Sequence, residues 1–291
     1  MSEHTVPLDI IENIIDILIN DYDGLECIKA FSLTCRAILP LCRTHMFSFI
    51  RIFINADTRI DVKEMAHSST AFEQLLLETP EIATYILQLE ITLNGTMSES
   101  THFFDHVPQL TRLQSLDLNC FDFESLWSPT HWNDIPSSIQ RTLLIFIHLP
   151  TLTHLTLGWI QDFPISNLTP CNNLKRLSAK ELCLTSKHDL VSSPSYKPIQ
   201  LQALDINLAS LSVDVRSSRG WLALDLTWLE KICVELSEQH DTFLIREIIR
   251  KSLQLRDISL TGIFNIPFTG PVPITLLFCS SRNQFPRPGV G

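Results

Sequence analysis

A short apolar pattern, LxxLxL, recurs from residue 86 onward and limits the folds that this chain can adopt. Seven copies with apolar substitutions begin at residues 86, 113, 152, 174, 201, 229 and 255, and the copy at Leu174 is the weakest. Apolar residues that alternate along a short run are typical of a strand with one buried face. Most copies start between 22 and 28 residues apart. Such a period indicates stacked strand-plus-helix units that cover one another's apolar faces.

The repeated region resembles an irregular leucine-rich-repeat solenoid. Leu113, Leu116 and Leu118 form one clear copy. The family carries asparagine or cysteine nine places into each copy, and Asn94 fits that place. Four other copies have Phe121, Ile160, Ala209 and Ile263 there, so the resemblance does not extend to a regular asparagine ladder. An α/β or α+β domain with similar strands is the alternative.

The pattern also predicts an exposed strand face. Side chains alternate along a strand, so the fourth and sixth positions of each copy point inward and the third, fifth and seventh positions point outward. Solenoids use such faces for binding. The acidic members suggest a basic or peptide-like ligand, and an ordinary solvated sheet face is the alternative. The candidate substrate-binding residues are Ser115, Asp117, Asn119, His154, Thr156, Asp205, Asn207, Lys231, Glu235, Asp257 and Ser259.

The N-terminal segment carries more apolar surface than one small helix can bury alone. One stripe contains Leu8, Ile11, Ile15 and Leu18, and a second stripe beside it contains Ile10, Ile14 and Ile17. A surface helix of a globular domain usually has a single apolar stripe. We expect one stripe to pack inside the chain and the other to contact a partner. The alternative is that the rest of the chain covers both stripes, and the pattern does not say which stripe would face a partner.

This N-terminal segment resembles an F-box, in particular the fungal subgroup. The motif residues are Val6, Pro7, Asp9, Ile10, Ile11, Ile14 and Leu18, then Leu25, then the run from Leu33 to Arg36, and finally the ending from Leu41 to Ile52. Two departures are visible, because the usual first leucine is Val6 and the tryptophan often found near Ala37 is absent. The resemblance implies docking on the Skp adaptor of a cullin–RING ligase. The implied adaptor-binding residues are Pro7, Leu8, Ile11, Ile14, Ile15, Leu18, Leu25 and Ile28.

Together the two resemblances imply a three-helix F-box over residues 1–46, a leucine-rich-repeat-like substrate-binding region over 47–279 and a disordered tail over 280–291. The fold class expected is a mixed α+β or α/β chain with a strand-plus-helix solenoid. The implied function is the substrate-recognition subunit of an SCF-type ubiquitin ligase, which holds an unknown substrate protein and does no chemistry itself. A protein-binding scaffold without a ligase role is the first alternative, and an enzyme with an unrecognised site is the second.

Composition excludes several other classes of function. The 291-residue chain has a net charge of −10, whereas nucleic-acid binding needs a basic footprint. The eight cysteines are scattered without CxxC pairs, so we expect reduced thiols in the cytoplasm or nucleus and no zinc site. No phosphate-binding glycine loop or dinucleotide fingerprint is present, so no cofactor is expected. The uncharged run from Ile258 to Ser281 is interrupted by prolines and glycines, which argues against a membrane span.

Two histidine sites are functional candidates. His102 and His106 are one helical turn apart, a spacing that can hold a metal, but no third ligand is placed. An ordinary helix or loop surface is the preferred interpretation. His131, near Trp127 and Trp132, fits either a pocket rim or a loop that packs against the solenoid.

Local signals predict the helices. The first helix should start near Pro7 and stop in the polar stretch 20–24. A short second helix contains Leu25, Ile28 and Phe31, and a third is capped by Ser32 or Thr34 and kinked or broken at Pro40. A strand over 47–54 and a helix over 62–79 follow. Ser137 and Gln140 form a capping box before a helix over 139–149, and another helix carries Phe243 to Leu253.

Overall fold

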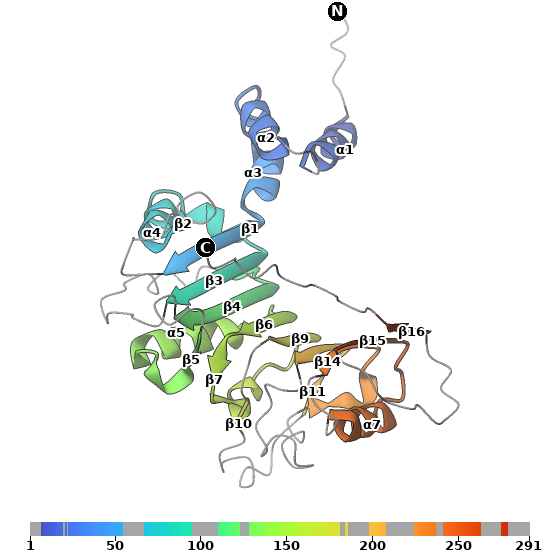
Figure 1. Cartoon of the computed structure of the whole chain (residues 1–291). Coiled ribbons are helices and arrows are strands. Elements are labelled where there is room, and N and C mark those ends of the chain that lie inside the picture. Colours follow the sequence, from blue (N-terminus) through green and yellow to red (C-terminus); the bar gives the residue numbers. More distant parts are fainter. Residues whose placement is uncertain are drawn as a thin grey trace, which may run out of the picture. The chain divides into compact units, whose positions relative to one another are not determined.

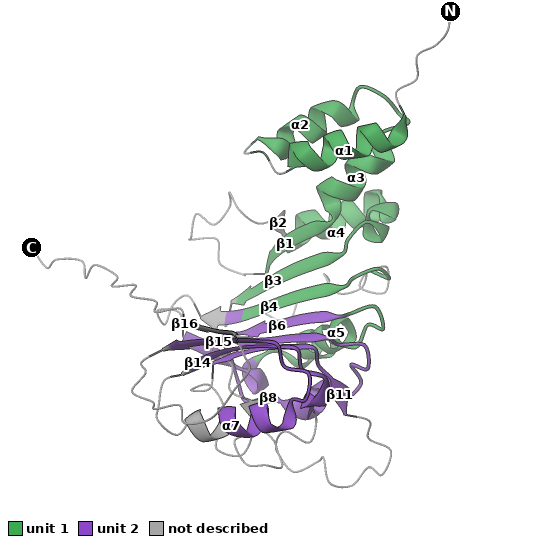
Figure 2. Cartoon of the chain, turned by 90° about the vertical axis from the view of Figure 1, so that its right-hand side faces the viewer, with its two compact units in different colours: residues 1–119, 135–152 green, residues 120–134, 153–291 purple. Residues whose placement is uncertain are grey.

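The computed structural model shows a mixed α/β chain with a mostly parallel sheet (Figure 1). It describes residues 7–19, 21, 23–54, 67–94, 110–122, 128–180, 184–185, 198–207, 224–236, 241–262 and 275–278. The chain divides into two compact units (Figure 2). The first contains residues 1–119 and 135–152, and the second contains residues 120–134 and 153–291. The predicted boundary after residue 46 therefore lies inside the first unit.

Three helices begin the first unit: α1 (Leu8–Ile19), α2 (Gly24–Ser32) and α3 (Leu39–Phe47). They share a small core of Ile15, Ile28, Ile38 and Cys42, of which only Ile38 retains any exposure. Ile11, Leu18, Ile19, Phe31, Leu41 and Met46 pack around that core and are partly buried. The predicted start and end of α1 are confirmed, and α2 contains Leu25, Ile28 and Phe31 as predicted.

The start of α3 differs from the prediction. Ser32 is the last residue of α2, and its hydroxyl donates to the carbonyl oxygen of Lys29 at 2.6 Å. The Thr34 hydroxyl donates backward in the same way to the Phe31 carbonyl at 2.7 Å. Both hydroxyls thus serve the end of α2, and α3 starts only at Leu39 without a side-chain cap. Pro40 lies in the first turn of α3, where its missing N–H breaks no helical hydrogen bond, so it causes no kink.

The sheet of the first unit starts with β1 (Phe49–Ile54), which pairs in parallel with both β2 (His67–Ser68) and β3 (Gln88–Asn94). Next to β3 lies β4 (Ser115–Asp122), whose first five residues belong to this unit. The helix α4 (Ser69–Glu78) packs on β1 and β2 through Phe72 and Leu76, and the 3-10 helix η2 (Pro80–Thr84) follows it. The helix predicted over 62–79 is therefore too long at its start, because His67 and Ser68 pair with β1; residues 55–66 lie outside the described residues.

The helix α5 (Ser137–Ile147) completes the first unit and corrects another local prediction. Ser137 is its first helical residue rather than its cap, because Pro136 occupies the capping position. The Gln140 side chain donates its Nε2 hydrogen to the Ile135 carbonyl at 2.9 Å instead of closing a capping box. Ile139, Leu143, Phe146 and Ile147 form the buried face of this helix.

The second unit is built on parallel strands that pair in the order β6, β9, β12, β14, β15 and β16. Their bounds are β6 (His154–Gly158), β9 (Arg176–Lys180), β12 (Ala203–Asn207), β14 (Lys231–Leu236), β15 (Asp257–Gly262) and β16 (Thr275–Phe278). The helix α7 (Asp241–Lys251) lies between β14 and β15 in the chain and starts two residues before the predicted position.

Short elements connect these strands. They are β5 (Ser128–His131), η4 (Trp132–Asp134), β7 (Ile160–Gln161), β8 (Phe163–Pro164), η5 (Ile165–Leu168), β10 (Leu184–Thr185), β11 (Ile199–Gln200), β13 (Leu224–Asp225) and η9 (Leu226–Trp228). β8 pairs with β10, and β11 pairs with β13, in two small parallel sheets. β5 pairs in parallel with β7 and antiparallel with the end of β4.

One register recurs along the chain. In all seven LxxLxL copies the strand begins at the third residue of the copy, at Gln88, Ser115, His154, Arg176, Ala203, Lys231 and Asp257. The amide of that residue donates to the second-residue carbonyl of the preceding copy at 3.0 Å in several cases, for example Lys231 to Gln202 and Asp257 to Glu230. Because these bonds set the pairing, the fourth and sixth residues of every copy are buried. The predicted strands and their inward faces are confirmed.

None of the helices in the described part of the chain combines the length and the apolar character that crossing a bilayer requires. Several predicted features fall outside the described residues: the His102 and His106 pair, Trp127 and the tail over 280–291.

Candidate functional site

The first candidate site is an apolar surface on α1. Ile10, Ile14 and Ile17 are 46%, 42% and 72% exposed, and Leu8 beside them is 53% exposed. Leu25 at the start of α2 is 45% exposed. We call Ile10, Ile14 and Ile17 the α1 stripe. A single exposed isoleucine is ordinary on a protein surface, but three on one helix face form a patch of the kind that marks interaction sites.

Most of the other stripe of α1 packs in the helical core. Ile15 is completely buried, and Ile11 and Leu18 are partly buried against it. The expected internal packing of one stripe is therefore observed for Ile11, Ile15 and Leu18, whereas Leu8 at its start is 53% exposed. Contact of the α1 stripe with a partner stays a prediction. Polar side chains border the α1 stripe, because Asp9, Glu12 and Asp16 are exposed on the same helix. An apolar centre with a polar rim is the usual anatomy of a protein interface.

The residues predicted to bind the adaptor fall into three groups. Pro7, Leu8, Ile14 and Leu25 are exposed, and Ile11 and Leu18 are partly buried. Ile15 and Ile28 are 0% exposed. These two side chains cannot contact a partner while the helical core stays folded. They are therefore removed from the predicted contact set, because they stabilise the helical core instead. Ile10 and Ile17, which the predicted set omits, are more exposed than Ile14.

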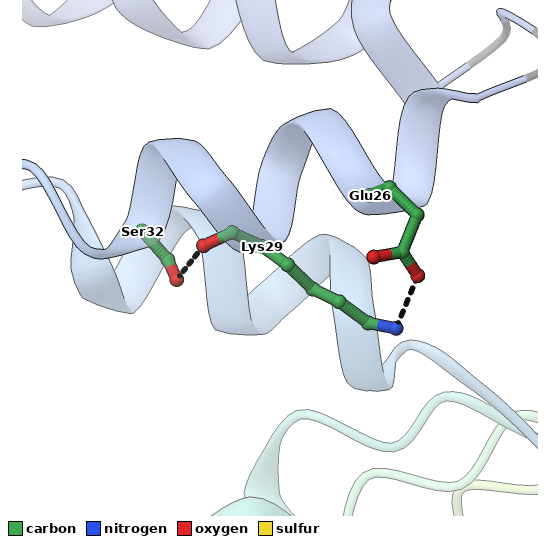
Figure 3. Close-up of polar contacts among 3 residues, drawn as sticks. All are labelled: Glu26, Lys29 and Ser32. Atoms are coloured by element: carbon green, nitrogen blue, oxygen red, sulfur yellow. Dashed lines mark hydrogen bonds and ion pairs between the residues drawn. The ribbon is translucent and has the colours of Figure 1, made fainter.

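The surface of α2 is organised by local polar contacts (Figure 3). Lys29 Nζ lies 2.6 Å from Glu26 Oε1, one helical turn away, and Ser32 bonds back to the Lys29 carbonyl. Both charged side chains are largely exposed, so this ion pair contributes little to stability. Leu25 at the start of the same helix remains accessible.

The second candidate site is the exposed face of the strands. All eleven candidate substrate-binding residues lie on that face and are exposed or half-buried, as the alternation predicts. Ser115, Asp117 and Asn119 lie on β4, where Asn119 donates its amide to Asp117 Oδ1 at 2.9 Å. His154 and Thr156 lie on β6. In the second unit Lys231 and Asp257 are register partners at one end of their strands.

A pocket of about 290 Å³ brings some of these residues together at the carboxyl ends of the strands of the second unit. Asp205, Asn207 and Glu235 were predicted from the repeat, as were the outward positions of Cys233 and Thr261. The pocket adds residues that the prediction missed, above all Trp159 and Lys180. Its described lining consists of Trp159, Lys180, Asp205, Ile206, Asn207, Cys233, Glu235 and Thr261.

Hydrogen bonds between neighbouring strands order the pocket. Ser178 Oγ donates to Asp205 Oδ2 at 3.1 Å, and Asn207 Nδ2 donates to Glu235 Oε2 at 3.2 Å. Burial and the nearby Asp205 carboxylate raise the pKa of the Cys233 thiol, and the Ser259 hydroxyl opposes that rise. A thiol with a raised pKa stays protonated at neutral pH and is a poor nucleophile. Cys233 therefore stays neutral in this pocket.

Trp159 follows β6 and has a left-handed backbone with φ of 59°. Its N–H donates to the Lys180 carbonyl at 3.0 Å, and its own carbonyl accepts from Thr130 N–H at 3.0 Å. No pattern in the sequence predicts this left-handed conformation of Trp159. Lys180 could have been found, because it is the seventh position of the weak copy that starts at Leu174; treating that copy like the others would have placed Lys180 on the exposed face.

His131 and Trp132 do not belong to this pocket. His131 Nδ1 lies 2.9 Å from Asp162 Oδ2. Trp132 is 3% exposed and packs edge-on against Phe163, with 4.8 Å between ring centroids. Trp132 thus packs against a neighbouring segment, as the second of the two interpretations of this stretch predicts. Within the described ranges no group of three or more histidine, cysteine or acidic residues is arranged to hold a metal.

Comparison with known proteins adds no relative. No family model matches the chain, no curated protein matches its sequence, and no solved structure matches its fold. The function of the chain is therefore inferred from the geometry of the α1 stripe and of the exposed strand face.

Proposed function

We propose that this chain is an F-box substrate-recognition subunit of a cullin–RING ubiquitin ligase. The three N-terminal helices would dock on the Skp adaptor, and the strand region, as an irregular leucine-rich-repeat solenoid, would hold a substrate protein. The chain would contribute proximity, which turns ubiquitin transfer between two proteins into a positioned event.

The exposure of the α1 stripe is the observation that carries the proposal. A helix that keeps three isoleucines on its surface while a parallel stripe fills the core is suited to dock in an apolar groove. The spacing of Ile10, Ile14 and Ile17 places all three on one side of the helix. The F-box resemblance covers this same segment and names an adaptor as the occupant.

The constant strand register supports the second half of the proposal. Seven copies start their strands at the same place. Within the second unit the outward, mostly polar positions of β9, β12, β14 and β15 lie side by side from strand to strand. A surface of that kind can contact a substrate protein at several points at once. Its polar character also leaves it soluble when no substrate is bound.

The proposal is tested by co-purification of the full-length chain with a fungal Skp adaptor. An Ile14→Asp, Ile17→Asp variant places two unpaired carboxylates in the proposed interface, so binding should fall below detection. A matched control, Leu77→Asp with Ile145→Asp, changes two apolar side chains that are 60% and 46% exposed on α4 and α5. The control should bind as the unmutated chain does.

Each outcome has a clear meaning. Loss of the adaptor in the stripe variant alone, with unchanged melting, supports the F-box assignment. Failure of the unmutated chain to bind the adaptor overturns it and leaves a protein-binding scaffold. Equal loss in both double variants also overturns it, because the α1 stripe would then have no special role.

A further inference from the structure

We propose that the pocket bordered by Trp159, Asp205 and Glu235 binds a basic side chain, preferably arginine, of an extended protein segment. This inference depends on the proposed substrate-binding role of the strand face and specifies its ligand. The pocket lies wholly within the second unit, on strands whose mutual register is defined.

Among the described residues, no ion pair neutralises the two carboxylates of the pocket. Asp205 and Glu235 accept hydrogen bonds from the neutral Ser178 hydroxyl and Asn207 amide. Neither carboxylate forms an ion pair with a cationic side chain in the described part of the chain. Lys180 likewise forms no ion pair with a described acidic side chain. A guanidinium has a planar fork of donors that matches carboxylates, so it would satisfy both acids.

Trp159 supplies the second element of recognition. A left-handed tryptophan is uncommon and strained, and such strain persists only where the surroundings hold the residue. The two backbone hydrogen bonds of Trp159, to Lys180 and Thr130, hold it in this conformation next to the pocket. Arginine stacks on aromatic faces more readily than lysine does, because its guanidinium is planar and weakly hydrated.

The size and position of the pocket restrict the ligand further. Pockets for drug-sized ligands and cofactors usually start at about 300 Å³, so about 290 Å³ suits one long side chain with its adjoining backbone. The pocket lies on the strand face that the described residues leave exposed, where an extended segment can cross several strands. Lys180 would then donate to a backbone carbonyl or an acidic side chain of the same segment.

The test uses full-length chain and two fluorescently labelled pools of capped nonapeptides. One pool has arginine fixed at the centre and the other has citrulline, which keeps the shape and removes the charge. Fluorescence anisotropy should show at least about tenfold tighter binding of the arginine pool. An Asp205→Asn, Glu235→Gln variant should abolish that preference while it keeps the volume of both side chains. Trp159→Leu should weaken binding of the arginine pool severalfold.

Two controls separate the pocket from general charge. Glu230→Gln with Asp134→Asn removes the same number of charges in the second unit, outside the pocket lining and outside the candidate substrate-binding residues, and should leave the preference unchanged. In addition, the arginine pool should slow alkylation of Cys233, measured residue by residue with mass spectrometry, but not that of the exposed Cys27 and Cys35.

The outcomes distinguish this inference from the proposed function. Equal binding of the two pools, or an unchanged preference in Asp205→Asn, Glu235→Gln, overturns the arginine pocket even if the chain binds the Skp adaptor. A pocket-dependent arginine preference in a chain that does not bind the adaptor supports the pocket and overturns only the ligase role.

Discussion

Ile14 and Ile15 are consecutive residues of α1, yet Ile14 is 42% exposed and Ile15 is 0% exposed. The difference follows from helical geometry, because consecutive residues point about 100° apart around the axis. Ile15 contacts the core that α1 shares with α2 and α3, whereas Ile14 faces outward with Ile10 and Ile17. The same residue type therefore serves stability at one position and is accessible to a partner at the next.

Truncation should separate these two roles. Ile15→Ala removes buried methyl groups and should lower the free energy of unfolding by about 2–5 kcal/mol. Ile17→Ala removes the same atoms from the surface and should change it by less than about 0.5 kcal/mol. Urea denaturation followed by circular dichroism would measure both. Similar losses in the two variants would contradict the assignment of the stripes.

Gly24 should resist replacement by alanine. A Cβ built on Gly24 would lie 1.9 Å from the Leu18 carbonyl oxygen, and backbone on that side cannot move freely. Gly24→Ala should therefore destabilise the helices by about 1–3 kcal/mol. Helix propensity alone predicts the opposite sign, because alanine is the better helix former. Thermal melting decides between them, and a Gly24→Ala variant that melts higher than the unmutated chain would refute the steric argument.

Asn207→Asp should weaken the pairing of β12 with β14. Asn207 donates to Glu235 across the two strands, and aspartate would place a like charge directly opposite. Such a pair costs about 0.2–1 kcal/mol. Because the repulsion is exposed, about 1 M salt should recover most of the loss. Asn207→Ser, which adds no charge, serves as the control and should show no recovery of stability with salt.

The stability of the second unit should fall in alkaline solution. Burial raises the pKa of the Cys171 thiol from 9.0 to about 12, which favours the neutral form in the folded chain. The stabilisation is complete below pH 9.0 and is lost as the pH rises toward 12, since the unfolded chain releases its proton first. The expected slope is up to about 1.4 kcal/mol per pH unit for this thiol.

A Cys171→Ala variant isolates that contribution. Lysine and tyrosine side chains also titrate in this range, so the useful quantity is the difference in slope between the two proteins and not either slope alone. Denaturation midpoints measured from neutral pH to about pH 11 should fall less steeply in the variant. Parallel slopes would show that Cys171 does not keep its proton through burial.

Local periodicity was sufficient to predict the seven repeated strands, their inward faces and the double stripe of α1, because these features depend only on which way successive side chains point. The capping signals at Ser32, Thr34 and Ser137 gave wrong helix starts. A serine or threonine hydroxyl can bond backward to the end of one helix as readily as it can cap the start of the next helix. Packing of α1 against α2 and α3 determines that Ile15, and not Ile14, lies in the core. The tertiary structure also brings Trp159, Lys180, Asp205 and Glu235 into one pocket. This pocket could not be predicted from any short run of the sequence. Its four side chains come from successive copies, and only the pairing of the strands places these copies side by side.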